Sequence, residues 1–444
     1  MDYRWFTRPL YLSYLKNQIT SFMQNVNYFK NKKITIVGLA RSGVACANLL
    51  HKLGSSVSIT DIKDNAQTRQ AAAKLCCADI IVELGKHSPE FIKEADLIVI
   101  SPGVPLDVAP IKWAKEFNKP VISEIEVASI LCPATIIAVT GSNGKTTVTT
   151  LIGKILEASG QGVFVCGNIG NPFCGEVENV KEGDFVVLEV SSFQLETIKD
   201  FKPKIAVILN LTPNHLDRYN NMQEYCDAKK RIAMNQDKND FLVLNENGPL
   251  LKDIAKNVNS KVVFFSKPDG LNPNQSAVLS VGNILGVDKD IILKVFNEFK
   301  GIDHRLEEVR NIGGIKFIND SKATTADSVI WAANDINTPI ILIAGGRHKN
   351  IDYRVIIEPA KNKVKQIILI GEAQKQIAAA LEGEFPIENA ATLEEAVQRA
   401  YALAKPGYTV LLSPMCSSYD MFTDYEERGR VFKKIVLALE EVRV

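Results

Sequence analysis

The sequence lacks the features that mark secreted, membrane-spanning and nucleic-acid-binding proteins. Its formal net charge is only +1 over 444 residues, so no general electrostatic field favours a polyanionic partner. Its eight cysteines include no C-x-x-C pair, which argues against a disulfide framework or a zinc site and for reduced thiols in the cytoplasm. Basic residues interrupt the apolar runs near the N-terminus. We therefore expect a cytoplasmic protein with no nucleic-acid partner and no stable membrane insertion.

What the sequence does contain is a series of short β-branched apolar runs that alternate with helix-like segments. Examples are ITIVG (34–38), IIAVTG (136–141) and PIILIAGG (339–346). Such runs are typical of parallel strands that helices cover on both faces, and the chain is too long for one core. We expect an α/β fold with three domains: a Rossmann-like N-terminal domain, a central P-loop-type ATPase domain and a C-terminal Rossmann-like domain. Their predicted ranges are 32–131, 132–300 and 301–444, after an extension (1–31) that is either disordered or upstream of the true start.

The segment AVTGSNGKTTVTTLIG (138–153) has the context of a phosphate-binding loop, because a buried strand leads through glycines into a helix. It is not a regular Walker A motif, since Val139 occupies the position of the first glycine. The backbone N–H groups of Gly141 to Thr147 and the helix N-terminus suit phosphate oxygens. Lys145 would reach the β- and γ-phosphates, and Thr146 would bind Mg²⁺.

A second glycine turn, GLARSG (38–43), follows the first strand. Ala40 replaces the middle glycine of a dinucleotide fingerprint, which weakens any case for NAD. The turn still suits a nucleotide diphosphate that serves as a substrate handle. Asp61 ends the next strand, where an acidic residue can bind a ribose or a base edge. The alternative is a purely structural Rossmann turn.

Three further candidates follow strands of the central domain. Glu189 ends a buried apolar run, where a lone carboxylate is costly unless a cation such as Mg²⁺ is bound. His215 lies in the loop of NHLDRY (214–219), at the edge where open α/β sheets bind ligands. Lys229 lies on a predicted helix, and its residue type alone does not indicate a role, since an ammonium would repel Mg²⁺.

The last block gathers cations and hydroxyls at the carboxyl ends of its strands, which suits an acidic small substrate; the alternative is solvated loop charges. The cations and hydroxyls are Lys322, Thr324, Arg347, Lys349, Ser417 and Ser418, and the same loops also supply the carboxylate of Asp320.

Five motifs in this order resemble the Mur ligase family of ATP-dependent, amide-forming enzymes, from about Val26 to the C-terminus. Besides TGSNGKTT (140–147) they are GLARSG, SSFQLE (191–196), NHLDRY, DSKAT (320–324) and SPMCSSYDMF (413–422). Within the family they look like the member that adds D-glutamate. The resemblance implies that ATP phosphorylates the L-alanine carboxylate of UDP-N-acetylmuramoyl-L-alanine, and that the amine of D-glutamate attacks the acyl phosphate. It implies small-molecule substrates, a monomer and a place in peptidoglycan precursor synthesis.

The resemblance also assigns roles to individual residues. It implies two Mg²⁺ ions, with Thr146, Glu189, His215 and Lys229 as ligands, Lys229 acting as a carbamate formed with CO₂. The catalytic residues would be Lys145, Glu189, His215, Lys229 and Lys322. ATP would bind to Gly141, Ser142, Asn143, Gly144, Lys145, Thr146, Thr147, Asn274, His304, Arg305 and Asp320. The UDP-linked substrate would bind to Arg41, Ser42, Asp61, Gly103, Asn168, Ser191 and Gln194. D-glutamate would bind to Thr324, Lys349, Ser418 and Tyr425, with Lys322 beside it.

The sequence departs from the family pattern in three places, one of which is the additional N-terminal extension. Asn214 replaces an acidic residue that commonly precedes the histidine, and the 246–275 stretch is short, so Asn274 in LNPNQS stands in for the usual adenine motif. Three alternatives stay open. They are another Mur or folylpolyglutamate-type ligase, a P-loop regulatory ATPase, and a nicotinamide dehydrogenase that Ala40 disfavours.

Overall fold

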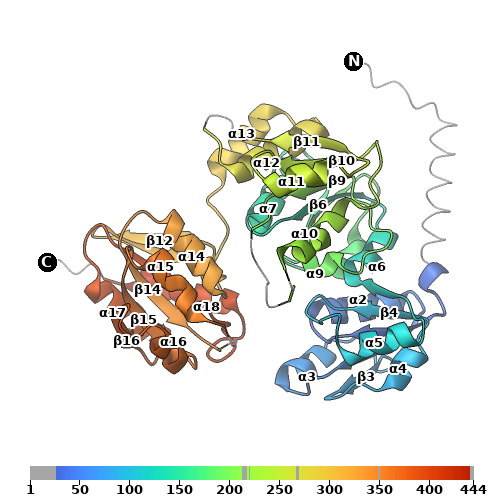
Figure 1. The fold of residues 1–444 in the computed structure, drawn as a ribbon, viewed down its shortest axis with the longest axis horizontal. Helices are drawn as coiled ribbons and strands as arrows, with labels where there is room; N and C mark the ends of the chain where they lie inside the picture. The colour runs from blue at the N-terminus through green and yellow to red at the C-terminus, as the bar shows by residue number, and fades with distance from the viewer. Residues whose placement is uncertain (1–26, 213–217, 220, 267–269, 349–350, 441–444) are drawn as a thin grey trace. The chain divides into compact units, whose positions relative to one another are not determined.

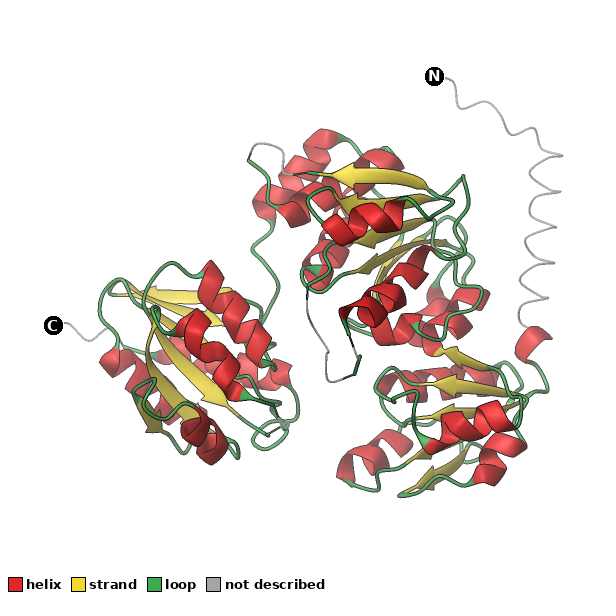
Figure 2. Cartoon of the chain, viewed as in Figure 1, coloured by secondary structure: helices red, strands yellow, loops and turns green. Residues whose placement is uncertain are grey.

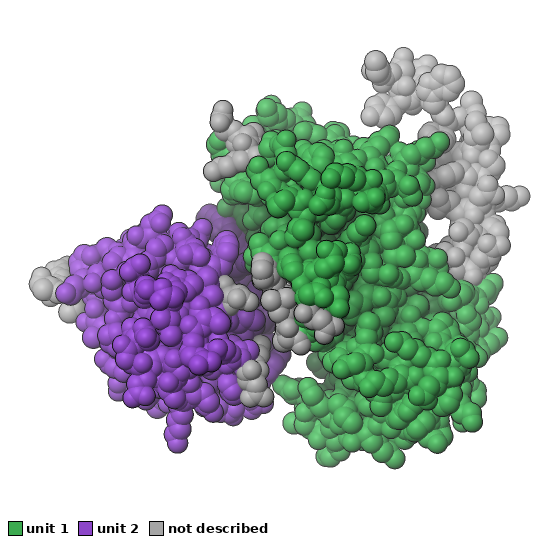
Figure 3. Space-filling model, viewed as in Figure 1, with its two compact units in different colours: residues 1–299 green, residues 300–444 purple. Residues whose placement is uncertain are grey.

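Three separate sheets organise the chain, as the computed structural model shows for residues 27–212, 218–219, 221–266, 270–348 and 351–440 (Figure 1). The chain divides into two compact units, residues 1–299 and 300–444, which are described separately (Figure 3). Unit 1 holds two of the sheets and unit 2 holds the third. None of the helices in these described ranges is both long and apolar enough to cross a membrane.

The first sheet of unit 1 is parallel and has the order β3-β2-β1-β4-β5. Its order reverses beside β1, which is where ligands bind in open α/β sheets. Its strands are β1 (Lys33–Val37), β2 (Ser56–Asp61), β3 (Ile81–Leu84), β4 (Leu97–Ile100) and β5 (Val121–Ser123). Its helices are α2 (Arg41–Lys52), α3 (Ala66–Ala72), α4 (Pro89–Lys93), α5 (Ala109–Glu116) and α6 (Glu124–Leu131).

The second sheet of unit 1 is also parallel, with the order β11-β10-β9-β6-β8-β7. Its strands are β6 (Thr135–Thr140), β7 (Val163–Gly167), β8 (Phe185–Glu189), β9 (Ile205–Ile208), β10 (Phe241–Asn245) and β11 (Lys261–Phe265). The helices are α7 (Lys145–Ala158), α8 (Phe173–Glu176), α9 (Ser192–Leu195), α10 (Met222–Lys230), α11 (Pro249–Ala255), α12 (Pro273–Leu285) and α13 (Lys289–Glu298), with 3₁₀ turns at Val177–Asn179 and Arg231–Ala233.

One apolar core joins the two sheets of unit 1. It runs from Phe29 through strands of both sheets to Ile254. Helix α6 carries the chain from the first sheet to the second, and its buried Glu126 accepts backbone N–H groups from residues 199–201. The second sheet has a separate core on its other face, where α7, α12 and α13 pack. Both faces of its central strands are therefore buried, which explains their continuous apolar sequences.

Unit 2 has a mixed sheet of order β12-β13-β17-β14-β15-β16, in which the β12 edge strand is antiparallel. The strands are β12 (Glu307–Ile312), β13 (Ile315–Asn319), β14 (Ile340–Gly345), β15 (Val364–Ile370), β16 (Ile387–Asn389) and β17 (Thr409–Leu412). The helices are α14 (Ala326–Asp335), α15 (Ile357–Ala360), α16 (Gln374–Ala380), α17 (Leu393–Leu403) and α18 (Tyr425–Ala438), with a 3₁₀ turn at Tyr353–Ile356. Helices cover both faces of the sheet (Figure 2). The predicted three-domain α/β fold is confirmed, with one antiparallel edge strand added.

Candidate active site

The phosphate loop connects buried strand β6 to the N-terminus of α7. Gly141 has φ +153° and Gly144, which caps α7, has φ +83°, both in the region that favours glycine. A Cβ at Gly144 would collide with the side-chain oxygen of Asn274 on α12, so the residue predicted for adenine binding lies over this loop. A Cβ at Gly141 would come within 3.0 Å of Leu209 Cβ. Close packing from two sides therefore fixes the shape of the loop.

Asn210, which sequence reasoning missed, anchors the loop from the end of β9. Its side-chain oxygen accepts the Asn143 N–H (2.8 Å) and its backbone carbonyl accepts the Ser142 N–H (3.0 Å). The Ser142 hydroxyl donates to the Thr212 carbonyl (2.9 Å). In this structure, then, the backbone N–H groups of Ser142 and Asn143 hold the loop in place and do not face outward. A polar residue two positions after a buried strand is the signal that could have revealed Asn210.

Lys145, the first residue of α7, folds back over the loop. Its ammonium donates to the carbonyls of Gly141 (2.9 Å) and Ser142 (3.0 Å). Thr146 beside it is buried. The predicted phosphate-binding cation and the predicted Mg²⁺ ligand thus occupy the first turn of one helix, whose N-terminus favours anions.

Glu189 ends β8 and is only 2% exposed. Strand register places it beside Val139 of β6 and Gly167 of β7. The Oε1 atom accepts the Asn168 side-chain amide (2.7 Å), whereas Oε2 is buried and has no hydrogen-bond partner among the described residues. A buried carboxylate oxygen without a partner is costly unless a cation compensates it. This donor fits Mg²⁺, which prefers carboxylate oxygen ligands.

Lys229 on α10 is also 2% exposed, and its ammonium nitrogen lies 3.2 Å from the Thr140 hydroxyl at the end of β6. Burial lowers the pKa of Lys229 well below its usual value, and repulsion from Lys145 lowers it further, while Glu189 opposes the change. The aromatic ring of Tyr225, one turn earlier, lies 4.8 Å from the nitrogen. Burial therefore makes the neutral amine more accessible for Lys229 than for an exposed lysine.

The residues predicted to hold the UDP-linked substrate lie at the carboxyl ends of strands in unit 1. Gly38 has φ +102°, and Arg41 at the start of α2 is exposed, with its guanidinium 3.5 Å from the Gly170 carbonyl. The Asp61 carboxylate accepts the backbone N–H groups of Leu39 (2.8 Å) and Lys63 (2.8 Å), so it also orders the turn after β1. A side chain at Gly103 would meet no atom within 4 Å.

Ser191 and Gln194 have a structural role that sequence reasoning missed. They form the capping box of α9: the Ser191 hydroxyl accepts the Gln194 N–H (3.3 Å), and the Gln194 side chain accepts the Ser191 N–H (3.0 Å). The S-x-x-Q spacing is the sequence signal for this cap. Their predicted contact with substrate stays a prediction. His215 and Lys349 lie outside the described residues.

In unit 2, Asp320 follows β13 and accepts the Ser413 hydroxyl (2.9 Å) and the Leu306 N–H (3.3 Å). Burial raises the pKa of this carboxyl to about 7. His304 has φ +64°, and its Nδ1 lies 2.9 Å from the Asn319 amide nitrogen; burial lowers the pKa of this imidazole. The Arg305 guanidinium lies 6.0 Å from the ring of Trp331 on α14.

Arg428, which sequence reasoning missed, ties together two loops that carry predicted D-glutamate ligands. It is 1% exposed and donates to the Ser321 hydroxyl (3.0 Å), the Ser321 carbonyl (2.9 Å) and the Cys416 carbonyl (3.3 Å). Ser321 adjoins Lys322 in DSKAT, and Cys416 lies near the buried Ser418. The ammonium of Lys322 lies 5.8 Å from the ring of Tyr425, the first residue of α18. Thr324 is half-buried in the same loop.

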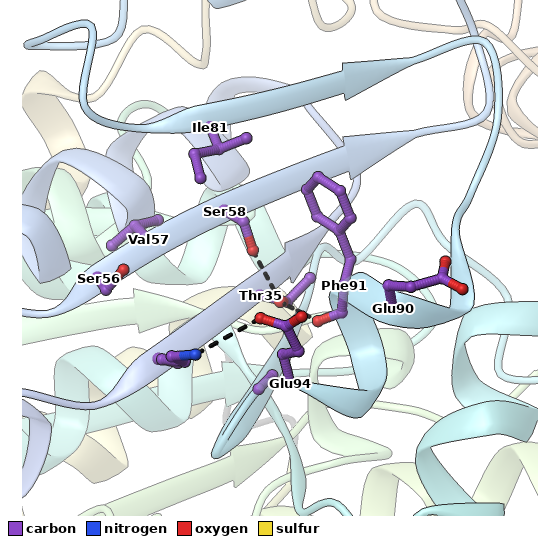
Figure 4. Close-up of a pocket in the computed structure, with 10 residues that line it drawn as sticks. Thr35, Ser56, Val57, Ser58, Ile81, Glu90, Phe91 and Glu94 are labelled. Carbon is purple, nitrogen blue, oxygen red and sulfur yellow. Dashed lines mark hydrogen bonds and ion pairs between the residues drawn. The ribbon is translucent and has the colours of Figure 1, made fainter.

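A cavity of about 270 Å³ lies at the amino-terminal ends of strands in the first sheet, whereas the predicted ligand sites lie at the carboxyl ends (Figure 4). Lys33, Ser56 and Ile81, the first residues of their strands, line it together with Phe91 of α4. The loops that carry Gly38 and Asp61 leave the carboxyl ends of these strands. This cavity is therefore separate from the predicted ligand sites.

Comparisons with known proteins identify the family of the chain. Three family models match in order: the Mur ligase MurD-like N-terminal domain (residues 32–123), the Mur ligase middle domain (139–284) and the Mur ligase glutamate ligase domain (304–416). A UDP-N-acetylmuramoylalanine--D-glutamate ligase from Geotalea daltonii is 41% identical, and the match covers 92% of this chain and 98% of that protein. A ligase of the same name from Clostridioides difficile is 38% identical over 91% of this chain and 98% of its own length.

Solved structures show the same fold at low sequence identity. The UDP-N-acetylmuramate-alanine ligase MurC from Thermotoga maritima has a TM-score of 0.55 and 20% identity, covering 92% of this chain and 100% of its own. MurF from Acinetobacter baumannii has a TM-score of 0.56 and 14% identity, covering 93% and 98%. From the near-full-length identity to curated relatives and the three matching domains, we conclude that the chain belongs to the Mur ligase family.

Proposed function

We propose that the chain is an ATP-dependent ligase that joins D-glutamate to UDP-N-acetylmuramoyl-L-alanine through an acyl phosphate. The observation that carries this proposal is the match, at about 40% identity over nearly the whole chain, to relatives named for that reaction. The charged residues around the phosphate loop support it, because phosphoryl transfer requires an arrangement that offsets the charge of crowded anions.

The reaction transfers the γ-phosphoryl group of ATP to the L-alanine carboxylate, releasing ADP. The D-glutamate amine then attacks the acyl carbon, phosphate leaves, and the amine loses a proton. The Lys145 ammonium, which contacts two loop carbonyls in this structure, would bind the transferred phosphoryl group. The N-terminus of α7 would bind the phosphates, and the shape of the loop from Gly141 to Gly144 would orient them.

Mg²⁺ would be held by Thr146 and Glu189, and a second ion by His215 and a carbamylated Lys229. When bound, these ions would neutralise the charge of the phosphates and of the acyl phosphate. The unpartnered Oε2 of Glu189 supports the first assignment. Asn168 holds the other oxygen of that carboxylate and so fixes its direction.

The surroundings of Lys229 support the carbamate. A lysine amine attacks CO₂ only when it is neutral, and burial of Lys229 lowers its pKa well below the usual value. The neutral amine attacks CO₂, forms a C–N bond and releases one proton, which converts a neutral side chain into an anionic one. Such an anion beside Lys145 is attracted, whereas the ammonium is repelled.

Several finer assignments belong to the same proposal. Three sheets, one in each predicted range, support the domains 32–131, 132–300 and 301–444. Arg41, Ser42 and Gly103 would hold the UDP-linked substrate, and Thr324, Lys349, Ser418 and Tyr425 would hold D-glutamate. We place the reaction in the cytoplasm, since all eight cysteines are free thiols, and take the working form to be a monomer.

The test compares Lys229→Ala with the control Lys230→Ala, its half-buried neighbour on α10. Phosphate release should require both UDP-N-acetylmuramoyl-L-alanine and D-glutamate, fall to background in Lys229→Ala and persist in Lys230→Ala. Removing dissolved CO₂ should slow the wild type, and labelled bicarbonate should give a carbamate NMR signal that Lys229→Ala lacks. A fully active Lys229→Ala enzyme would contradict the carbamate assignment.

The choice of amine tests the substrate. D-glutamate should be used in preference to L-alanine and meso-diaminopimelate. If one of those two amines were preferred, the chain would be another ligase of the family. Phosphate release that is indifferent to both substrates would instead indicate a regulatory ATPase.

A further inference from the structure

One imidazole and two thiols meet at the C-terminal end of helix α2, whereas the predicted ligand residues of this helix lie at its N-terminal end. His51 lies in the last turn of α2, and Cys76 and Cys77 lie in the segment after α3. Figure 1 labels both helices. Their ligand atoms all lie within 4.8 Å of one another, and Cys77 Sγ is 3.1 Å from His51 Nε2. The sequence spacing indicated no zinc site, because residues 25 positions apart meet only through the packing of α3 against α2.

Helix α2 also holds the backbone that leads into the two thiols. The Asn48 side-chain oxygen accepts the Cys76 N–H (2.9 Å), and its amide donates to the Lys74 carbonyl (3.2 Å). Cys77 is half-buried against the core of unit 1, while Cys76 is exposed. The folded domain therefore presets the positions of the ligands, and the exposed thiol leaves a path by which an ion can enter.

The donor set selects a particular kind of ion. Two thiolates and an imidazole suit Zn²⁺ and other thiophilic metals, whereas Mg²⁺, Ca²⁺ and Mn²⁺ prefer oxygen ligands, which this cluster lacks. Zinc accepts three protein ligands at about 2.0–2.3 Å with a water in the fourth position. Two thiolates would neutralise the charge of Zn²⁺, and the C-terminal end of α2 favours a cation.

We propose that His51, Cys76 and Cys77 form a zinc-binding site whose fourth ligand is water. Zn²⁺ forms two bonds to sulfur and one to His51 Nε2, and the two thiols release one proton each, with no change in oxidation state. The ion links the end of α2 to the turn after α3 and so stabilises the N-terminal domain.

This site is distinct from the proposed substrate site on the same helix. Helix α2 has 12 residues, with Arg41 and Ser42 at its first turn and His51 at its last. At about 1.5 Å per residue, the two ends lie roughly 16 Å apart. Zinc bound at His51 therefore contacts none of the residues that we assign to substrate binding or to the ligase reaction.

The test is a titration of the full-length, metal-free, reduced protein with Zn²⁺ by calorimetry and with Co²⁺ by absorbance. We expect one Zn²⁺ per chain, release of protons on binding, and a thiolate-to-cobalt charge-transfer band of tetrahedral type. Cys76→Ser and His51→Gln should each weaken binding by about a hundredfold or more, since each removes one of three ligands. Cys132→Ser removes a half-buried thiol outside the cluster; it is the control and should bind Zn²⁺ as the wild type does.

A second readout keeps the test independent of any single variant. Zn²⁺ should raise the thermal unfolding midpoint of the wild type and of Cys132→Ser but not that of Cys76→Ser. Because Cys76 is exposed, its serine variant should fold and retain ligase activity. The absence of a charge-transfer band in the wild type, equal Zn²⁺ affinity in Cys76→Ser, or a Cys76–Cys77 disulfide in place of metal binding would each overturn the proposal.

Discussion

Glu124 makes the stability of unit 1 depend on pH. It is the first residue of α6, is 1% exposed, and accepts the Cys174 N–H (2.6 Å) through Oε1. Its Oε2 atom has no hydrogen-bond partner within the described part of the chain. Burial raises the pKa of this carboxyl from 4.5 to about 7, although the N–H groups of Cys174 and Phe173 oppose the change.

The sign of the effect follows from the two pKa values. Between pH 4.5 and about 7 the folded chain keeps a proton that the unfolded chain has lost. The contribution to stability is therefore complete below pH 4.5 and is lost as the pH rises through about 7. The difference between these two pKa values of Glu124 corresponds to about 3 kcal/mol in the free energy of unfolding.

Glu124→Gln removes the titration while keeping an oxygen that can accept the Cys174 N–H. We expect the free energy of unfolding of the variant to lose the decline that Glu124 causes between about pH 5 and pH 7. At about pH 8 the variant should be more stable than the wild type by about 1–2 kcal/mol, because the buried charge is gone but the amide N–H₂ lacks a full set of partners.

The assay is urea unfolding at a series of pH values, followed by the fluorescence of Trp113 on α5 in unit 1. A background with Trp5→Phe and Trp331→Phe removes the other tryptophans. Glu178→Gln is the control, since this glutamate is partly exposed and pairs with Lys52 at 2.8 Å. If the wild-type and Glu124→Gln curves ran parallel between about pH 5 and pH 7, the reasoning would be refuted.

Two other substitutions test individual contacts within unit 1. Glu126→Ala should destabilise unit 1 by about 3 kcal/mol or more, because three backbone N–H groups of residues 199–201 lose a buried carboxylate. Hydrogen exchange at these amides should accelerate. Unchanged exchange would contradict the role assigned to Glu126. Gly144→Ala should weaken ATP binding in calorimetry by at least about tenfold, since φ is +83° and the new Cβ meets Asn274. Gly160→Ala is the control, because Gly160 has a similar φ of +82° but a Cβ there would meet no atom within 4 Å. Equal ATP affinity in the two variants would refute the role of the contact between residue 144 and Asn274.

The fold was largely predictable because its signals are local. Apolar runs such as 136–141 are long enough for one strand each, and glycines mark the turns into helices. The three-domain α/β prediction is confirmed for this reason. The antiparallel β12 strand was not predicted, because its sequence, EEVRNI, is mostly polar and lies at a sheet edge.

The candidate site was predictable only in part. Lys145 and Thr146 follow directly from the loop motif, and Glu189 follows from a charge at the end of an apolar run. Asn210 and Arg428 carry no comparable motif, although they hold the loops that present the predicted ligands. Their importance comes from partners distant in the sequence.

The sequence by itself determined most of the strands and the phosphate loop, because periodicity and motif spacing are properties of neighbouring residues, and its motifs carried the resemblance to an ATP-dependent ligase family. Only the tertiary structure decided that Lys229 is buried beside Thr140, that Glu189 keeps an oxygen without a partner, and that His51 meets two thiols. Each of these depends on which strand ends and helix ends adjoin, and on how much water their packing excludes. Burial and proximity set the pKa values and ligand geometry, and neither can be read from composition or spacing.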